Sequence, residues 1–246
     1  MIPKVIHYCW FGRKPLPKEA CRCIDSWRRH CPEWEIRRWD EDNFDIDAVA
    51  YTREAASKGK WAFVSDYARF KILYDHGGVY LDTDVELIRP LDNIIARGPF
   101  MGFEKSHVGV GVNSGLGIGA TSHHPVYKSI IDLYSGLHFL DAEGRQNPGT
   151  VVYHITQLLI PLGLKLEDRE QEIGGITIYP HSYFNPLDDA TGRLDIRPET
   201  VSVHHYAKTW CDNYGPLRTR LMRFLHRHLG VTTLGKIREA IFPAHK

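Results

Sequence analysis

The sequence lacks any run of about 18 or more apolar residues, so we expect none of it to span a membrane. It also shows no internal repeat and no low-complexity segment, which argues against a repeat architecture. The 246 residues carry a formal net charge of only +1, so charge gives no reason to expect a nucleic-acid partner. What remains is a composition ordinary for a globular protein, with 43% hydrophobic and 25% charged residues.

Cysteine is scarce, and its number is odd. The chain has 5 cysteines, and its charged, proline-containing start does not resemble a secretory signal. We therefore expect a reducing, cytoplasmic location. Cys21, Cys23 and Cys31 lie close together in the sequence, but their spacing differs from that of the usual zinc sites and the last two fall in a helix-like segment. A zinc cluster is therefore disfavoured.

The first forty or so residues predict a β-α-β unit, the opening half of a Rossmann-like nucleotide-binding sheet. An apolar strand at 4–10 is followed by an amphipathic helix at 18–30 and a second strand at 33–39. Later strands are expected at 79–81, 99–104, 173–179 and 201–206, and later helices at about 48–58, 63–74, 125–139 and 150–162. We predict an α/β fold with a mixed sheet flanked by helices, formed by a domain at 1–215.

Residues 61–86 form the stretch around which the chain is organised. Aromatic side chains three or four residues apart predict the helix at 63–74. Gly77 and Gly78 are expected to end it, because glycine adopts the left-handed cap conformation without steric cost. The β-prone run at 79–81 is typical of a strand buried on both faces.

Asp82 and Asp84 follow this strand at its carboxyl end, where open α/β sheets bind their ligands. Two adjacent carboxylates repel each other unless a cation lies between them. Mg²⁺ and Mn²⁺ prefer carboxylate oxygen and commonly bring substrate phosphates. The alternative to a metal–phosphate site is a solvated strand end.

Asp66 and Arg69 lie three residues apart on a helix face that is otherwise apolar. Arginine offers a planar fork for phosphate, and aspartate can accept hydrogen bonds from sugar or base groups. A plain salt bridge within the helix is the alternative. The glycine-dense segment 109–120 is a poor helix but would let a ligand approach the backbone, and it lacks the Gly-Lys-Ser/Thr ending of a P-loop.

Two pairs of residues near strand ends are weaker candidates. His204 and His205 alternate across a strand end, so they point to opposite faces, and one of them could complete a metal's ligand set. Trp10 and Trp210 end apolar runs, where a tryptophan more often belongs to the core than to a ligand platform.

The last segment, 216–246, is strongly basic. Its cations are Arg218, Arg220, Arg223, Arg227, Lys236, Arg238 and Lys246, against Glu239 alone. Helical spacing of apolar residues predicts a basic amphipathic helix to about 229 and a shorter one at 234–242. Two readings stay open: a helical pair packed on the domain, or a contact with an anionic membrane surface.

These residues together make a recognisable set. Residues 65–84 read S-D-x-x-R-x-x-x-L-x-x-x-G-G-x-Y-x-D-x-D, the chain starts with IPKVIHYCWFG, and VHHYAKTW ends at Trp210. The chain thus resembles the glycosyltransferases with a DXD sugar-binding region. These include yeast-type initiating α-1,6-mannosyltransferases, bacterial capsular-polysaccharide and lipopolysaccharide transferases and, more distantly, the glucosyltransferase domains of large clostridial toxins. The likeness is strongest over 1–120 and loose over 120–200.

The resemblance implies a GT-A fold that binds a nucleotide-diphosphate sugar through Mn²⁺ or Mg²⁺. Trp10 would stack on the nucleobase, and Asp66 and Arg69 would hold the sugar and diphosphate. Tyr80 and Asp82 would contact the ribose and the water shell of the metal.

The resemblance also implies roles for the second aspartate of the DXD motif and for residues of the later loops. Asp84 would ligate the metal directly, and Asn113 would lie beside the sugar. His205 would be the late metal ligand, with His204 as the alternative, and Trp210 would contact the β-phosphate.

The expected activity is retaining hexosyl transfer, with a UDP-sugar as the favoured donor and with Arg69, Asp82 and Asp84 as catalytic residues. Because no residue is an obvious covalent nucleophile, we expect front-face displacement. The acceptor would be a saccharide, including a lipid-linked one, in synthesis of a bacterial-type surface polysaccharide such as capsule or lipopolysaccharide. The basic segment 216–246 would then favour the inner face of the cell membrane.

Two other functions fit parts of the sequence. Leu81-Asp82-Thr83-Asp84-Val85 resembles the signature of haloacid-dehalogenase-type phosphatases, although that signature usually lies near the chain start. The second is a non-catalytic protein that binds nucleotide sugars.

Overall fold

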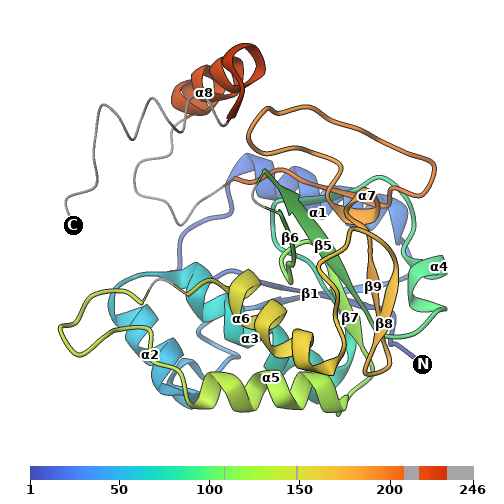
Figure 1. The fold of residues 1–246 in the computed structure, drawn as a ribbon. Coiled ribbons are helices and arrows are strands. Elements are labelled where there is room, and N and C mark those ends of the chain that lie inside the picture. Colours follow the sequence, from blue (N-terminus) through green and yellow to red (C-terminus); the bar gives the residue numbers. More distant parts are fainter. Residues whose placement is uncertain (108, 148, 208–215, 232–246) are drawn as a thin grey trace.

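The computed structural model describes residues 1–107, 109–147, 149–207 and 216–231. A mixed β-sheet lies between two layers of helices (Figure 1). Its strands are β1 (Val5–Cys9), β2 (Glu35–Trp39), β3 (Gly78–Tyr80), β5 (Phe100–Ser106), β6 (Gly109–Val112), β7 (Ile118–Ala120), β8 (Gln171–Ile173) and β9 (Ile176–Tyr179). They run in the order β2-β1-β3-β7-β5-β9-β8, with β6 paired to β5. The predicted α/β class, with a mixed sheet flanked by helices, is confirmed.

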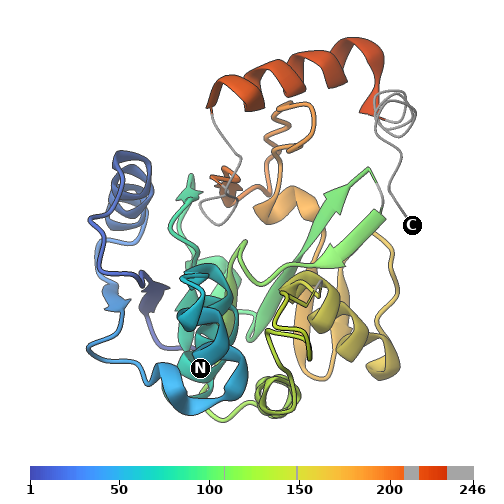
Figure 2. The same ribbon diagram turned by 90° about the vertical axis from the view of Figure 1, so that its left-hand side faces the viewer.

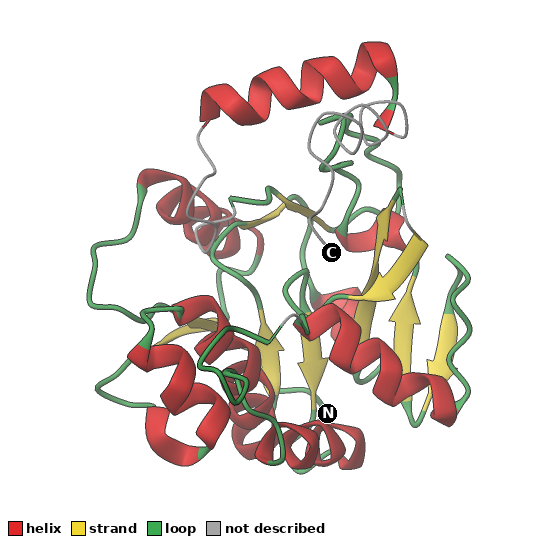
Figure 3. Ribbon diagram, turned by 60° about the vertical axis from the view of Figure 1, so that its left-hand side comes forward, coloured by secondary structure: helices red, strands yellow, loops and turns green. Residues whose placement is uncertain are grey.

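The helices cover both faces of this sheet, as Figures 2 and 3 show. These are α1 (Lys18–His30), α2 (Ala50–Ser57), α3 (Trp61–His76), α4 (Asp92–Ile95), α5 (Pro125–Ser135), α6 (Val151–Leu159) and α7 (His181–Phe184), with short 3₁₀ turns at Ile46–Ala48 and Ile160–Leu162. One further described helix, α8 (Pro216–Leu229), is not part of these layers. One core cluster lies under α2, α3, α5 and α6, and the other under α1, α4 and α7. Of the described helices, none is both long and apolar enough to cross a membrane.

The predicted opening unit is confirmed. Strand β1 pairs in parallel with β2 on one side and with β3 on the other. Helix α1 buries the apolar face that its sequence spacing predicted, including Cys23, Ile24 and Trp27. Cys21 on the same helix is exposed. Among the described residues, these cysteines are not part of a group that could hold a metal ion.

Helix α3 ends where the two glycines predicted. Gly77 has φ of 67° and Gly78 has φ of 100°, a region that side-chain-bearing residues rarely adopt. A Cβ on Gly78 would lie 2.8 Å from the carbonyl oxygen of Val5. The pair therefore lets the chain turn sharply from α3 into β3 and pack closely against β1, so that the Asp-x-Asp sequence leaves the middle of the sheet. Asp82 and Asp84 thus follow the carboxyl end of β3, as the sequence predicted.

Two parts of the secondary structure differ from the prediction. Segment 109–120, which was expected only to be a poor helix, contains strands β6 and β7. In β7, Gly119 has no side chain, so the Phe100 ring can pack against its backbone; a Cβ there would lie 2.3 Å from the ring. The predicted strand at 173–179 is a hairpin, β8–β9, which turns at Gly174 and Gly175 with φ of 57° and 79°. Glycine patterns alone did not distinguish a loop from close strand packing.

A separate two-stranded ribbon returns the late chain to the sheet. Strand β10 (Ser202–His204) pairs antiparallel with β4 (Val85–Leu87), and His204 lies opposite Val85. The segment expected to close the site thus meets the residue that follows Asp84. Helix α8 lies apart from the sheet (Figure 1), whereas the shorter helix expected at 234–242 falls outside the described residues.

Candidate functional site

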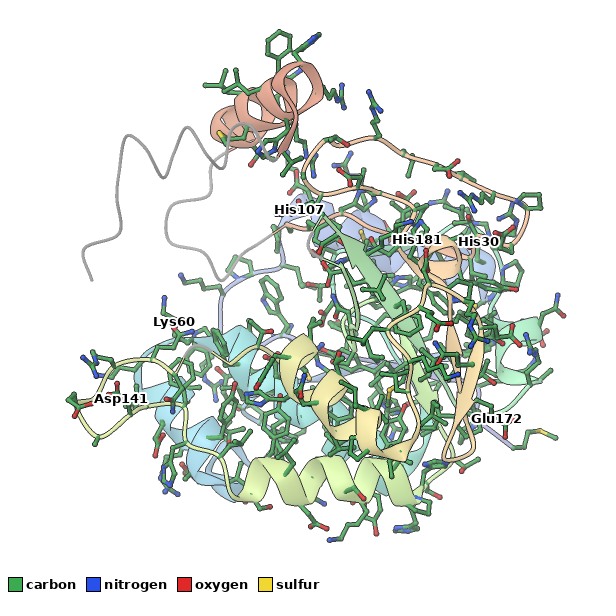
Figure 4. All side chains as sticks on the ribbon, viewed as in Figure 1. His30, Lys60, His107, Asp141, Glu172 and His181 are labelled. Atoms are coloured by element: carbon green, nitrogen blue, oxygen red, sulfur yellow. The ribbon has the colours of Figure 1, made fainter. Side chains whose placement is uncertain are left out.

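A cleft of about 910 Å³ opens at the end of β3, a size typical of small-molecule sites. Its floor contains Asp82 and Asp84, and its walls come from the start of α3, the β5–β6 hairpin, the first turns of α6 and the segment after β10. Lys60, labelled in Figure 4, lines it just before α3. The carboxylates predicted from the strand end therefore do lie in a concave site.

Asp82 is held from three sides. The Tyr80 hydroxyl donates a 2.9 Å hydrogen bond to Asp82 Oδ1, and Arg69 Nη2 lies 3.3 Å from the same oxygen. On the third side is Gly115, where a Cβ would lie only 2.3 Å from Asp82 Oδ2. Burial and the neighbouring Asp84 raise the pKa of Asp82, although Arg69 opposes this. The position of this carboxylate is thus set by packing as well as by charge.

Asp84 is paired with a histidine from the distant strand β10. His204 Nε2 lies 3.2 Å from Asp84 Oδ1, and the Ala207 N–H donates a 2.8 Å hydrogen bond to Oδ2. Burial by itself would raise the pKa of Asp84, but His204 and Ala207 outweigh it and lower the pKa to about 2. Burial likewise disfavours a charged His204, yet Asp84 raises its pKa to about 9.

His204, and not His205, lies where the resemblance placed the late metal ligand. His205 is partly exposed, and its Nε2 pairs with Glu86 at 2.8 Å. His204, kept as the alternative, is buried beside Asp84. The reason is register: antiparallel pairing with β4 turns the side chain of His204 toward the cleft, and alternation along the strand turns that of His205 away.

The group of Asp82, Asp84 and His204 fits a divalent cation. Each residue offers one ligand atom, and these atoms lie within 4.8 Å of one another. Among the described residues, no other His, Cys, Asp or Glu cluster meets this condition. Two carboxylate oxygens and an imidazole nitrogen are chemically suitable donors.

Arg69 joins the two acidic residues predicted from the sequence. Its Nη2 lies 3.0 Å from Asp66 Oδ1 as well as near Asp82, its Nη1 donates to the Ser114 hydroxyl at 3.1 Å, and its Nε donates to the Ser65 carbonyl oxygen at 3.0 Å. The salt bridge within the helix is therefore present, but it is buried and reaches across to the Asp-x-Asp strand. Arg69 is 3% exposed, and most of its donors bind protein groups.

Asp66 lines the cleft and is itself buried. Burial, together with the charge of Asp82, raises the pKa of Asp66 to about 7, although Arg69 opposes the shift. This carboxyl therefore changes its charge close to neutral pH.

Tyr80 does not occupy the place expected of it. Its side chain is 1% exposed, its ring lies under the Arg69 guanidinium at 4.9 Å, and its hydroxyl binds Asp82. Tyr80 does not line the cleft, so a direct contact with ribose is not supported; the residue supports Asp82 from behind. Trp10 does line the cleft, with its indole N–H donating to the Lys14 carbonyl oxygen at 2.7 Å. Trp210 falls outside the described residues.

Asn113 lines the cleft as part of a network that the sequence did not reveal. Its Oδ1 accepts from Gly115 N–H at 2.7 Å, and its Nδ2 donates to Glu104 at 2.7 Å. The hydroxyl oxygen of Tyr206 lies 3.2 Å from Glu104 Oε1 and 2.8 Å from Asn185 Oδ1, within hydrogen-bonding distance of both. Tyr206 has φ of 54°, which is strained for a tyrosine. In the sequence, the position of Tyr206 directly after His204 and His205 was a signal that it belongs to the site, whereas no sequence pattern marked Glu104.

Comparison with known proteins agrees with this geometry. Residues 17–101 match the family model described as a glycosyltransferase sugar-binding region containing a DXD motif. The match includes Asp66, Arg69, Asp82 and Asp84, and it favours a glycosyltransferase over the phosphatase alternative.

Curated relatives are glycosyltransferases as well. Inositol phosphoceramide mannosyltransferase 1 of Schizosaccharomyces pombe is 28% identical over 150 residues, covering 56% of this chain and 43% of the relative. An uncharacterized glycosyltransferase, L373, of Acanthamoeba polyphaga mimivirus is 29% identical over 141 residues, covering 53% and 54%. The chain thus spans about half the length of these relatives.

Solved structures with a related arrangement include the PaToxG glycosyltransferase, with a TM-score of 0.48 and 18% identity over 65% of this chain and 69% of that one. Another is a glycosyltransferase involved in glycosylation of the major capsid of PBCV-1, with a TM-score of 0.45 and 12% identity over 90% and 100% of the two chains.

Proposed function

We propose that this chain is a metal-dependent glycosyltransferase that moves a hexose from a nucleotide-diphosphate sugar, with a UDP-sugar as the favoured donor, to a saccharide acceptor. The observation that carries this proposal is the convergence of Asp82, Asp84 and His204 in the cleft. The match of residues 17–101 to the sugar-binding region supports the same conclusion.

Asp82, Asp84 and His204 would hold the cation. Carboxylates suit both Mg²⁺ and Mn²⁺, whereas the imidazole nitrogen favours the transition metal, so Mn²⁺ is the preferred candidate. When bound, such a cation neutralises charge on the diphosphate leaving group. The buried partners of Asp82 and Asp84 would keep both carboxylates in place for this role.

The surrounding residues would bind and orient the donor. Arg69 would stabilise the negative charge that builds on the departing diphosphate, mainly through the carboxylates it positions, because most of its own donors are already used. Asp66 and Asn113 would lie beside the sugar, and Trp10 would stack on the base. For Trp210, which lies outside the described residues, we retain the proposal that it contacts the β-phosphate.

The transfer itself would retain the anomeric configuration by front-face displacement. The C–O bond to the diphosphate breaks as the acceptor oxygen attacks the same face, and the acceptor proton passes to the departing phosphate. A single-turnover experiment that identifies the product anomer tests this step, and an inverted product would exclude it.

The proposed acceptor belongs to surface-polysaccharide synthesis of the bacterial type, including a lipid-linked saccharide at the cytoplasmic face of the membrane. Support comes from α8, on which Leu221 and Phe224 are 58% and 57% exposed. Arg223 and Arg227 on the same helix bind carbonyl oxygens of residues 189, 191 and 192. The helix is therefore attached to the domain through polar contacts while apolar side chains face outward.

A vesicle-binding experiment tests the membrane contact. Replacing both Leu221 and Phe224 with serine should reduce co-sedimentation with anionic phosphatidylglycerol vesicles, because it removes exposed apolar area without touching the contacts of Arg223 and Arg227. Unchanged binding by the double variant would exclude this surface.

A hydrolysis and transfer screen tests the enzymatic proposal. UDP-glucose, UDP-galactose, UDP-N-acetylhexosamines and GDP-mannose would be incubated with and without Mn²⁺. We expect Mn²⁺-dependent release of the nucleoside diphosphate from one donor, and Asp84→Ala should abolish it. Full activity in Asp84→Ala would refute the metal assignment, whereas tight donor binding with no turnover would indicate the non-catalytic alternative.

A further inference from the structure

The cleft extends well beyond the residues assigned to the donor. Its far wall is the first part of α6, where Thr150, Val151, Val152, Tyr153 and Gln157 line it. These side chains carry no charge, in contrast to the acidic floor. The wall is fixed in place, because the Thr156 hydroxyl accepts a 2.9 Å hydrogen bond from the backbone N–H of Val112 in β6.

Tyr153 is the notable residue of this wall. Its side chain is 58% exposed, and it lines both the cleft and a second hollow of about 320 Å³. Its backbone is held in the first turn of α6, where the Thr150 hydroxyl accepts from the Tyr153 N–H at 3.3 Å. An exposed aromatic face thus stands on a rigid element at the boundary of two adjoining hollows.

The second hollow has polar groups and a rigid frame. Tyr51 lines it, and its hydroxyl is buried with no hydrogen-bond partner among the described residues. The Tyr51 ring is fixed between Tyr134 and Phe139, at centroid distances of 5.0 and 5.9 Å. A buried hydroxyl without a partner is costly, and here it cannot turn elsewhere. The Tyr51 ring is therefore a rigid part of the wall of the hollow.

The loop that closes this hollow is also anchored. Glu54 on α2 accepts hydrogen bonds from the Leu140 N–H at 3.1 Å and pairs with His138 Nδ1 at 2.7 Å. Asn147, another lining residue, donates to the His138 carbonyl oxygen at 2.6 Å. These bonds connect the loop to the helical layer, so the hollow exists before any ligand enters.

We propose that Tyr153 is the central platform of an acceptor site for a neutral saccharide of at least two rings, one in the cleft and one in the second hollow. This rests on the proposed glycosyltransferase function. A sugar ring presents an apolar C–H face and polar edges, which match an exposed aromatic ring flanked by hydroxyl and amide groups. A lipid chain would need a continuous apolar wall, and the polar groups of Thr150 and Gln157 interrupt this one.

Saccharide binding by ligand-observed NMR, in the absence of nucleotide, tests the proposal. The probes are methyl glycosides of mannose, galactose and glucose and disaccharides of the same sugars. We expect at least one disaccharide to bind about tenfold more tightly than its methyl glycoside, because the disaccharide contacts both hollows. Tyr153→Ala should remove this advantage, and Tyr153→Phe should keep it.

Two further variants sharpen the result. Tyr51→Phe deletes only a buried hydroxyl and keeps the ring that lines the hollow, so it should leave the advantage of the disaccharide unchanged. Leu162→Ala changes an exposed residue just beyond α6 that lines neither hollow, and it should bind as the wild type does. The proposal is overturned if no disaccharide binds more tightly than its methyl glycoside, or if Tyr153→Ala keeps the advantage. Failure of the donor function would appear separately, as absent Mn²⁺-dependent hydrolysis.

Discussion

Replacing Gly115 with alanine tests how tightly the position of Asp82 is specified. The new Cβ would lie 2.3 Å from Asp82 Oδ2 and 3.1 Å from Asn113 Oδ1, whereas ordinary contacts begin at 3.4 Å. The carboxylate oxygen must therefore move by about 1 Å, and misplacement of this size in a catalytic site costs on the order of 100-fold in rate. The atom that must move is the end of a side chain, so we expect the fold to survive.

The expected result for Gly115→Ala is thus an active-site defect with little loss of stability. Donor hydrolysis with Mn²⁺ should fall about 100-fold in kcat/KM, while urea unfolding should show a loss of about 1 kcal/mol, at the low end of overpacking costs.

Gly98→Ala is the matched control. Gly98 has φ of 97° and open space around its Cβ position, outside the cleft. This variant should lose about 1 kcal/mol of stability through backbone strain yet keep its activity. Wild-type activity in Gly115→Ala, or equal effects of the two variants on activity, would refute the reasoning.

Two other predictions concern the charged groups of the site. His204→Ala should weaken Mn²⁺ binding, measured by electron paramagnetic resonance, at least tenfold, while His205→Ala should not; the reverse order would show that the exposed histidine is the ligand. Burial raises the pKa of Asp66 from 3.8 to about 7, so the folded protein retains a proton that the unfolded chain loses. Stability from this group is therefore present below about pH 4 and declines as the pH rises to 7, by up to about 1.4 kcal/mol per unit. Asp66→Asn should lack that decline in urea unfolding between pH 5 and 7, and a wild-type advantage that does not change with pH would contradict the assignment.

Local patterns predicted much of the fold. The spacing of apolar residues in α1 and the aromatic repeat in α3 both led to helices that the structure contains, and Gly77 marked the end of α3. Glycines were ambiguous elsewhere. The sequence patterns predicted no strand in the segment around Gly119 and placed Gly174 inside a single strand, because the role of a glycine depends on what lies opposite it in the sheet.

The candidate site was predictable where its parts lie on one continuous stretch. Asp66, Arg69, Asp82 and Asp84 all lie on α3 or just after β3, so helical spacing and strand direction were enough. The choice between His204 and His205 required the register of β10 against β4, which no local pattern contains.

The most direct test of the central claim is calorimetric titration of UDP into the protein with and without Mn²⁺. If Asp82, Asp84 and His204 hold a cation that binds the donor diphosphate, Mn²⁺ should strengthen UDP binding at least tenfold, and Asp84→Ala should lose this gain. UDP binding that is equally strong without Mn²⁺, or a gain that survives in Asp84→Ala, would contradict the claim.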